Sequence, residues 1–291
     1  MRRALVLGGG GIVGVAWETA LLAGLMEGGV DLRDADLIVG TSAGSIVGSQ
    51  IASGRDPREM TREGRERPAP PAGDKPDVAS IAAVFTAWAS FYEMTPANCA
   101  RVGKLALEAK TMPEEELLAR SERNEGGAWP ASPLLIVAVD CESGEMRAFD
   151  AASGVPMQRA ISASCSVPGM FPPVTIEGRR YTDGGVRSGT SADLAERIAP
   201  DVVLIVAPMG SSTESAFGRL MARQIAAETA GLEAAGAKVA VIQFDDAATR
   251  AATSLMDPAA AAPAAAAAEA HGRRIADEIG AFWSGASTGR P

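Results

Sequence analysis

The sequence has very little histidine and cysteine, and both shortages narrow the chemistry available to it. Among 291 residues there is one histidine, His271. A single imidazole excludes histidine-rich zinc sites and any mechanism that uses two imidazoles. The cysteines, Cys99, Cys141 and Cys165, are three in number and widely spaced. They predict reduced thiols in a cytoplasmic protein, with no disulfide framework and no metal knuckle. We therefore expect no bound metal.

Basic charge is also scarce, and no apolar run is long. The chain has 27 Lys and Arg against 36 Asp and Glu, a net charge of −9. This balance disfavours nucleic acid and anionic membrane surfaces as partners. No apolar run approaches the roughly 20 residues of a transmembrane helix, and the apolar start is too short for a secretory signal. With 47% hydrophobic and 22% charged residues, the composition is typical of a globular protein.

Short apolar runs rich in β-branched residues alternate with longer helical patterns. This alternation predicts an α/β fold with a mainly parallel central sheet and helices on both faces. The expected strands of that sheet are 4–7, 37–39, 134–139, 202–206 and 239–244. A hairpin is expected over 174–177 and 179–181, and helices against the sheet over 14–26 and 45–53.

The chain shows no internal repeat and no convincing linker. We therefore expect a single domain over residues 1–283, followed by a frayed tail over 284–291. The dense mixed charge of 55–67 predicts a solvated helix, and the proline-rich stretch 68–73 predicts a loop. The alanine-rich stretch near the C-terminus is expected to be helical after Pro263.

A GxSxG motif lies between an expected strand and an expected helix. It consists of Gly40, Ser42 and Gly44. A strand-to-helix turn of this kind can hold a nucleophilic serine in a strained backbone, and the glycines avoid collisions that a Cβ would cause. The helix that starts there also directs free N–H groups toward the same point. The plain alternative is a small-residue turn in which Ser42 is the helix N-cap.

Four consecutive glycines follow the first expected strand. Gly9, Gly11 and Gly14 satisfy GxGxxG, the fingerprint of a dinucleotide site, which also needs an acid at the end of the second strand. The nearby acids all precede that strand: Asp31, Asp34 and Asp36. A second interpretation is an oxyanion hole made of glycine N–H groups. A third is a tight turn that packs the helix on the sheet.

A serine nucleophile needs a base, and the usual imidazole is hard to find. His271, in the alanine-rich stretch, is one alternative, and neither Lys104 nor Lys110 lies in a suggestive setting. Asp183 directly follows an expected strand and precedes Gly184 and Gly185. Burial beside apolar side chains would raise the basicity of its carboxylate, which makes Asp183 the leading base. The plain alternative is an Asx turn at the strand end.

The three motifs, in this order and each at a strand end, resemble those of the patatin-like phospholipases. The segments that carry the likeness are Gly9–Gly14, Gly40–Gly44 and Asp183–Gly185. Residues 163–174 also resemble the proline-rich approach of that family to its catalytic aspartate, and the likeness runs from about residue 4 to 208. Members of the family are acyl hydrolases with a Ser-Asp dyad and a glycine-rich oxyanion hole.

The resemblance implies a role for each matching residue. Ser42 is then the nucleophile and Asp183 its base, with no cofactor. The implied oxyanion donors are the amides of Gly9, Gly10, Gly11 and Ala43. The chain departs from the family at Val13, where Arg or Lys is common, so the charge-assisted part of the oxyanion hole is missing. The implied partner is a lipid or small ester, reached through transient contact with a membrane surface.

Residues 55–130 compare only loosely with the family, and we expect a partly helical cap there. Much of the scarce aromatic content recurs at helical spacing within it: Ile81, Val84, Phe85, Trp88, Phe91 and Tyr92. This stretch is either one more core helix or a cap that lines an acyl-binding pocket. Two other functions stay open, a catalytically weak acyl-lipid binding protein and a Rossmann-type nucleotide-binding protein.

Overall fold

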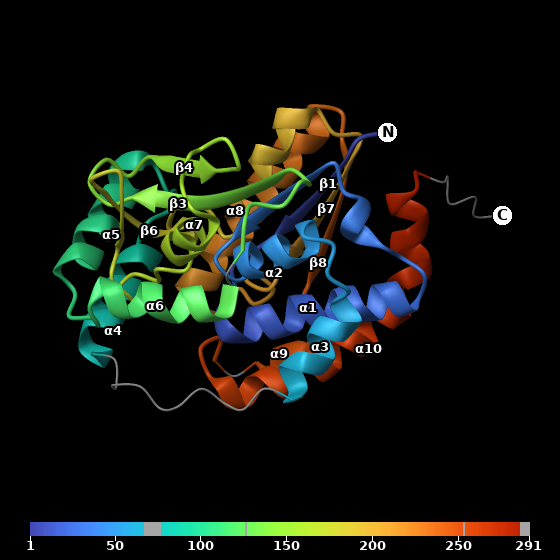
Figure 1. Ribbon diagram of the computed structural model, residues 1–291, viewed down its shortest axis with the longest axis horizontal. Coiled ribbons are helices and arrows are strands. Elements are labelled where there is room, and N and C mark those ends of the chain that lie inside the picture. Colours follow the sequence, from blue (N-terminus) through green and yellow to red (C-terminus); the bar gives the residue numbers. More distant parts are fainter. Residues whose placement is uncertain (67–76, 126, 253, 286–291) are drawn as a thin grey trace.

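The structure is a computed structural model that describes residues 1–66, 77–125, 127–252 and 254–285 (Figure 1). Its centre is an eight-stranded sheet in the order β5-β6-β3-β2-β1-β7-β8, with β4 paired to β3 off this path. The strands are β1 Arg3–Leu7, β2 Leu37–Thr41, β3 Leu134–Asp140, β4 Met146–Phe149, β5 Val174–Ile176, β6 Arg179–Asp183, β7 Val202–Ala207 and β8 Lys238–Gln243.

The predicted strands and the predicted hairpin are confirmed. β3, β2, β1, β7 and β8 pair in parallel in that order, whereas β4 and β6 are antiparallel to β3 and β5 is antiparallel to β6. β4 is a strand that the sequence pattern did not predict, because its four residues contain a single fully buried side chain. The antiparallel strands extend the sheet beyond β3, so that the end of β6 lies beside the middle of β3, with Asp183 opposite Ala138.

Alternate side chains of the central strands pack on opposite faces of the sheet, as the period of two in a strand requires. Leu5 and Leu7 of β1 belong to a core under the helices that contain Trp17 and Ile51. Ala4 and Val6 belong to a second core on the other face. Burial on both faces explains why these strands read as continuous apolar runs rather than as alternating ones.

Ten α-helices surround the sheet in the described ranges: α1 Gly11–Glu27, α2 Ala43–Ala52, α3 Pro57–Glu66, α4 Val78–Ala89, α5 Pro96–Glu108, α6 Glu114–Glu125, α7 Met157–Ser164, α8 Ala216–Ala234, α9 Asp246–Ala251 and α10 Pro258–Trp283. Figure 1 shows α1, α3, α9 and α10 together along one side, and α4, α5 and α6 grouped at one end. The predicted helices over 14–26, 45–53 and 55–67 correspond to α1, α2 and α3. The predicted loop over 68–73 lies outside the described residues.

The start of α10 differs from the prediction. The helix begins at Pro258 and contains Pro263, rather than starting after it. Asp257 caps it by accepting a hydrogen bond from the Ala259 amide at 2.9 Å, and proline is well suited to the first helical position. The helix ends at Trp283, while most of the expected frayed tail lies outside the described residues. No helix within the described ranges is long and apolar enough to cross a bilayer.

Candidate active site

Ser42 occupies a strained turn between β2 and α2. Its backbone has φ 53° and ψ −117°, the left-handed side of conformational space that a residue with a Cβ rarely adopts. The flanking glycines permit a very close approach: a Cβ at Gly40 would lie 2.6 Å from the Gly44 carbonyl oxygen, and one at Gly44 would overlap the Leu7 carbonyl. The Ser42 side chain makes no capping hydrogen bond, contrary to the N-cap alternative.

The glycine loop after β1 lies beside this turn. A Cβ added at Gly9 would be 3.5 Å from the Ser42 Cβ. The Gly9 amide donates a hydrogen bond to the Gly189 carbonyl at 2.8 Å, so it is already occupied and is not a free oxyanion donor. For the amides of Gly10, Gly11 and Ala43 no acceptor is found within the described ranges. Gly10 and Gly11 follow Gly9 in the loop and Ala43 follows Ser42, so these three amides are the candidate oxyanion donors.

Val13, the departure from the family pattern, does not face the turn. Its side chain is fully buried in a small cluster with Ala260 and Ala264 of α10. Its amide donates a hydrogen bond to the Leu255 carbonyl at 3.0 Å. Position 13 is therefore part of the packing between α1 and α10 and supplies no charged side chain that could stabilise an oxyanion.

Asp183 ends β6 and is buried, with 4% of its surface exposed. Its Oδ1 accepts a hydrogen bond from the Gly185 amide at 2.7 Å. Burial raises the pKa of Asp183 to about 7, while the Ser42 hydroxyl and the Gly185 amide act in the opposite direction. Oδ2 is buried and has no partner with hydrogen-bond geometry in the described part of the chain. The Ser42 hydroxyl thus lies near enough to lower the pKa of this carboxyl. Within the described residues, however, the two side chains do not meet the geometry of a hydrogen bond.

The end of α7 connects Ser42 to Asp183. The Ser164 hydroxyl accepts a hydrogen bond from the Ser42 amide at 2.9 Å, and the Cys165 thiol donates to the Ser42 carbonyl at 3.3 Å. The Ser166 carbonyl accepts a hydrogen bond from the Asp183 amide at 3.0 Å. Three consecutive residues, 164–166, therefore hold the backbone of both Ser42 and Asp183. The sequence marked this stretch by its resemblance to the small-residue, proline-rich approach to the catalytic aspartate, but it did not assign these contacts.

Helix α4 covers the Asp183 turn with apolar side chains. Trp88 is 3% exposed, and its ring tip would be 3.8 Å from a Cβ at Gly185. Its ring packs edge-on against Phe217 of α8, with 4.9 Å between ring centroids. Val78 at the start of α4 is exposed. The inner side of α4 is thus buried as a core helix requires and borders the candidate site, whereas Tyr92, expected in the same helix, lies beyond its end and is 79% exposed.

The alternative base, His271, and the acid that a dinucleotide site would need, Asp36, have other partners in the structure. The His271 Nδ1 is 3.8 Å from the Asp245 carboxylate, and burial lowers the pKa of this imidazole. Within the described ranges, the charged neighbours of His271 are Asp245 and Arg274, and neither Ser42 nor Asp183 is among them. At the opposite edge of the sheet from the glycine loop, Asp36 accepts a hydrogen bond from the Arg3 amide at 2.7 Å. It therefore cannot supply the ribose contact of a dinucleotide site at that loop.

Glu18 is a buried acid that the sequence analysis did not single out. Its side chain lies in α1 with no exposed surface, and neither carboxyl oxygen has a partner in the described residues. Burial raises the pKa of Glu18 well above its usual value, and the nearby Gly8 amide acts in the opposite direction. The signal in the sequence was one acid within an otherwise apolar stretch of helix.

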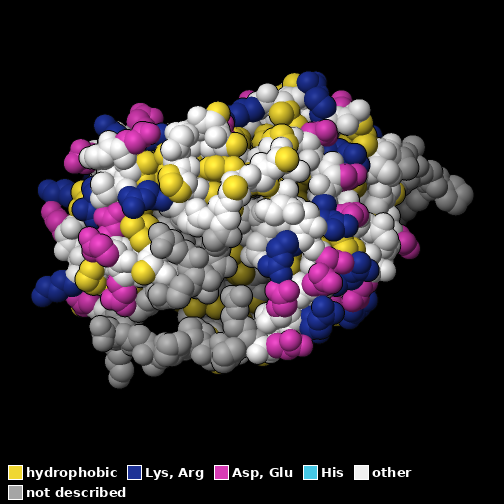
Figure 2. Space-filling model, in the orientation of Figure 1, with side chains coloured by type: hydrophobic (Ala, Val, Ile, Leu, Met, Phe, Trp, Pro, Cys, Tyr) yellow, Lys and Arg dark blue, Asp and Glu magenta, His cyan; other side chains and the backbone are white. Residues whose placement is uncertain are grey.

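No group of three or more His, Cys, Asp or Glu side chains that could hold a metal occurs in the described ranges. On the face in Figure 2, positive and negative side chains are interspersed. An open groove of about 360 Å³ between α8 and β8 is lined mainly by small and apolar residues, among them Ala222, Ala226 and Val241. Neither Ser42 nor Asp183 lines it, so this groove is separate from the candidate site.

The solved structures that are similar to this chain include two bacterial proteins. VipD from Legionella pneumophila is 14% identical with a TM-score of 0.46, and the match covers 95% of this chain and 67% of that one. The type III effector protein ExoU is 17% identical with a TM-score of 0.44, and the match covers 95% of this chain and 53% of that one. This chain thus spans about two thirds of VipD and about half of ExoU.

The sequence model of the patatin-like phospholipases matches residues 5–196. The match spans about two thirds of the chain and includes the glycine loop, the Ser42 turn and the end of β6. The chain therefore belongs to the patatin-like phospholipase family.

Proposed function

We propose that the protein is a serine acyl hydrolase that cleaves carboxylic ester bonds of lipids. Ser42 is the nucleophile, Asp183 is its base, and the amides of Gly10, Gly11 and Ala43 form the oxyanion hole. The observation that carries the proposal is the burial of the Asp183 carboxyl beside the Ser42 hydroxyl. A carboxylate in water is a weak base, but one with a pKa of about 7 can accept the serine proton near neutral pH.

In the first half of the reaction the Ser42 oxygen attacks the ester carbonyl carbon while Asp183 accepts the hydroxyl proton. The open amides stabilise the negative oxygen of the tetrahedral intermediate. The bond to the leaving alcohol then breaks, and Asp183 returns the proton to that alcohol. The product of this half is an acyl ester on Ser42.

In the second half, water attacks the acyl carbonyl and Asp183 accepts a proton from that water. The bond between the acyl carbon and the Ser42 oxygen breaks, and the proton returns to Ser42. The same donors serve both tetrahedral intermediates because the same carbonyl oxygen becomes negative in each. No imidazole and no metal is needed at any step.

The substrate class follows from the charge and the apolar surroundings of the site. With a net charge of −9, the protein is better suited to zwitterionic or neutral lipids than to anionic surfaces. The apolar side chains of Val84 and Trp88 near the Asp183 turn suit an acyl chain. We therefore expect transient contact with neutral or zwitterionic membrane surfaces during turnover.

The proposal is tested by ester hydrolysis with the parent and with Ser42→Ala. We expect Ser42→Ala to lose at least about 1,000-fold in kcat, because the nucleophile is removed. Ser49→Ala is the matched control, because its buried hydroxyl also lies in α2 but, within the described ranges, donates to the Ile46 carbonyl of its own helix. A series of esters with increasing acyl length gives the substrate preference. Equal activity of the parent and Ser42→Ala would overturn the proposal.

The second candidate function is that of a catalytically weak acyl-lipid binding protein, and the same experiment distinguishes it. It is motivated by the buried valine at position 13, which leaves the oxyanion site without a cationic side chain. This outcome would show lipid that co-purifies with the protein, no turnover of any ester, and no covalent labelling of Ser42.

A further inference from the structure

Asp183 starts a segment that contacts both other motifs of the candidate site. The 3-10 turn Gly184–Val186 follows it directly. Further on, the Gly189 carbonyl accepts the Gly9 amide at 2.8 Å, beside the glycine loop. The Thr190 carbonyl accepts the Thr41 hydroxyl at 3.4 Å, one residue before Ser42. The position of residues 184–191 therefore sets how the base lies relative to the nucleophile and the open amides.

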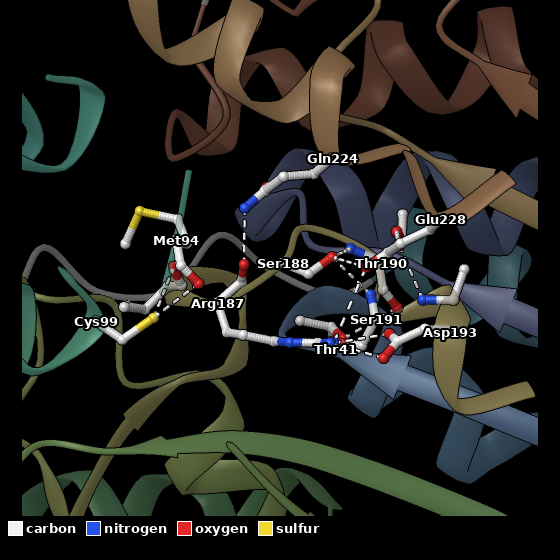
Figure 3. Close-up of polar contacts among 12 residues, drawn as sticks. Thr41, Met94, Cys99, Arg187, Ser188, Thr190, Ser191, Asp193, Gln224 and Glu228 are labelled. Atoms are coloured by element: carbon white, nitrogen blue, oxygen red, sulfur yellow. Dashed lines mark hydrogen bonds and ion pairs between the residues drawn. The ribbon is translucent and has the colours of Figure 1, made fainter. Parts of the chain in front are cut away.

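Glu228 of α8 holds this segment with both carboxyl oxygens. Its Oε1 accepts the Ser188 hydroxyl at 2.6 Å, and its Oε2 accepts the Ala192 amide at 3.0 Å and also the Thr190 hydroxyl. Its side chain is 11% exposed. Figure 3 shows Ser188, Thr190 and Ser191 gathered beside Glu228. Hydrogen bonds to a carboxylate are about twice as strong as those between neutral groups.

Further hydrogen bonds connect the same segment internally and to α8. The Ser188 hydroxyl also accepts the Ser191 amide at 2.9 Å. Arg187 forms two hydrogen bonds of 2.7 Å with Asp193 and lies 4.0 Å from Glu228. The Gln224 side chain, one turn before Glu228, donates to the Arg187 carbonyl at 2.7 Å. Helix α8 thus contacts the segment through two side chains, and Glu228 accepts three of the hydrogen bonds that residues 187–192 donate.

We propose that Glu228 is a positioning residue for the Ser42–Asp183 pair. It anchors residues 188–192 to α8, and through them it keeps Asp183, Thr41 and the Gly9 loop in one arrangement. It does not touch the substrate. The inference rests on the proposed function, because it concerns the same nucleophile and base.

The test compares Glu228→Ala and Glu228→Gln with the parent in ester hydrolysis. A displacement of about 1 Å in a catalytic group can cost about 100-fold in rate, so we expect kcat to fall about 100-fold in Glu228→Ala with KM within about twofold. Glu228→Gln keeps one acceptor oxygen and should recover part of the loss. Glu233→Gln is the matched control, since it removes an exposed acid from the same helix and should leave kcat unchanged.

Counting the active sites distinguishes a positioning role of Glu228 from a role in stability alone. A fluorophosphonate probe titrates the fraction of molecules that react, and kcat is expressed per reactive site. Positioning predicts a lower kcat per site and slower labelling of Ser42 in Glu228→Ala. An unchanged kcat per site, with only a lower melting temperature or fewer reactive sites, would overturn the inference.

Thr190→Val is a second variant in case Glu228→Ala fails to fold. It removes one hydroxyl donor to Glu228 while keeping the side-chain shape, so we expect a fall in kcat of about 3- to 10-fold. An unchanged kcat in both Thr190→Val and Glu228→Gln would contradict the inference. If the parent itself cleaves no ester, the proposed function fails. If Ser42→Ala alone loses activity, the function stands and only the role of Glu228 fails.

Discussion

At the scale of single residues, the chemistry of this site depends on where one carboxyl group lies. The motif around Asp183 gave its position after a strand, but its basicity comes from burial, to which the Trp88 ring and the sheet contribute. Desolvation disfavours the charged carboxylate and thereby raises its pKa. Burial thus raises the pKa of Asp183 to about 7, which suits the proposed role of base near neutral pH.

The pH dependence of the reaction follows from this burial. The base must be unprotonated, so kcat/KM should fall about tenfold per pH unit below a pKa of about 7 and level off above it. An aspartate with an ordinary pKa near 3.9 would leave the rate flat from about pH 5 upward. Fatty-acid release measured across this range decides between the two, with circular dichroism to verify the fold. A flat profile down to pH 5 would contradict the role of Asp183.

The residues that could be predicted from the sequence are those within short motifs. Ser42 and Asp183 each lie near glycines at a strand end, and the three motifs taken together, rather than any one of them, mark these residues as candidates. The partners of these residues are distant in sequence: Ser164 follows Ser42 by 122 positions. Nothing in a single sequence pairs such residues. Glu18 and Glu228 were not predicted either, because Glu18 is distinguished by its burial and Glu228 by hydrogen-bond donors that come from a distant segment.

At the scale of helices and strands, periodicity predicted most of the sheet. Strands buried on both faces give continuous apolar runs, which β1, β3 and β7 display. β4 was missed because it is short and half-buried. The start of α10 was placed too late because Pro263 is tolerated within a helix that a proline and a capping aspartate already begin at residue 258.

The close packing of α2 on β1 can be tested with paired glycine substitutions. A Cβ at Gly44 would overlap the Leu7 carbonyl, whereas one at Gly64 in α3 would meet nothing within 4 Å. We expect Gly44→Ala to lower the free energy of unfolding by about 3 kcal/mol or more. Gly64→Ala should be neutral or stabilising by up to about 1 kcal/mol, since alanine favours helix. Chemical denaturation measures both. An unchanged free energy of unfolding in Gly44→Ala would contradict the close approach of α2 to β1.

At the scale of the whole molecule, the fold brings together three chain segments that are far apart in sequence. The parallel order of β2, β1 and β7 places the Ser42 turn and the glycine loop at one edge of the sheet, and β6 brings Asp183 beside them. Helix α10 packs closely on α1, where a Cβ at Gly24 would overlap the Glu269 carbonyl. His271 lies on this helix with Asp245 as its neighbour, so the one imidazole belongs to a different part of the molecule.

The most direct test of the account is the rate at which a fluorophosphonate labels Ser42 in the parent, Asp183→Asn and His271→Ala, with the modified peptide identified by mass spectrometry. A general base typically contributes about 100- to 10,000-fold, so Asp183→Asn should label slower by that factor. His271→Ala should label as fast as the parent. Undiminished labelling of Asp183→Asn, or a comparable loss in His271→Ala, would contradict a serine activated by a buried aspartate alone.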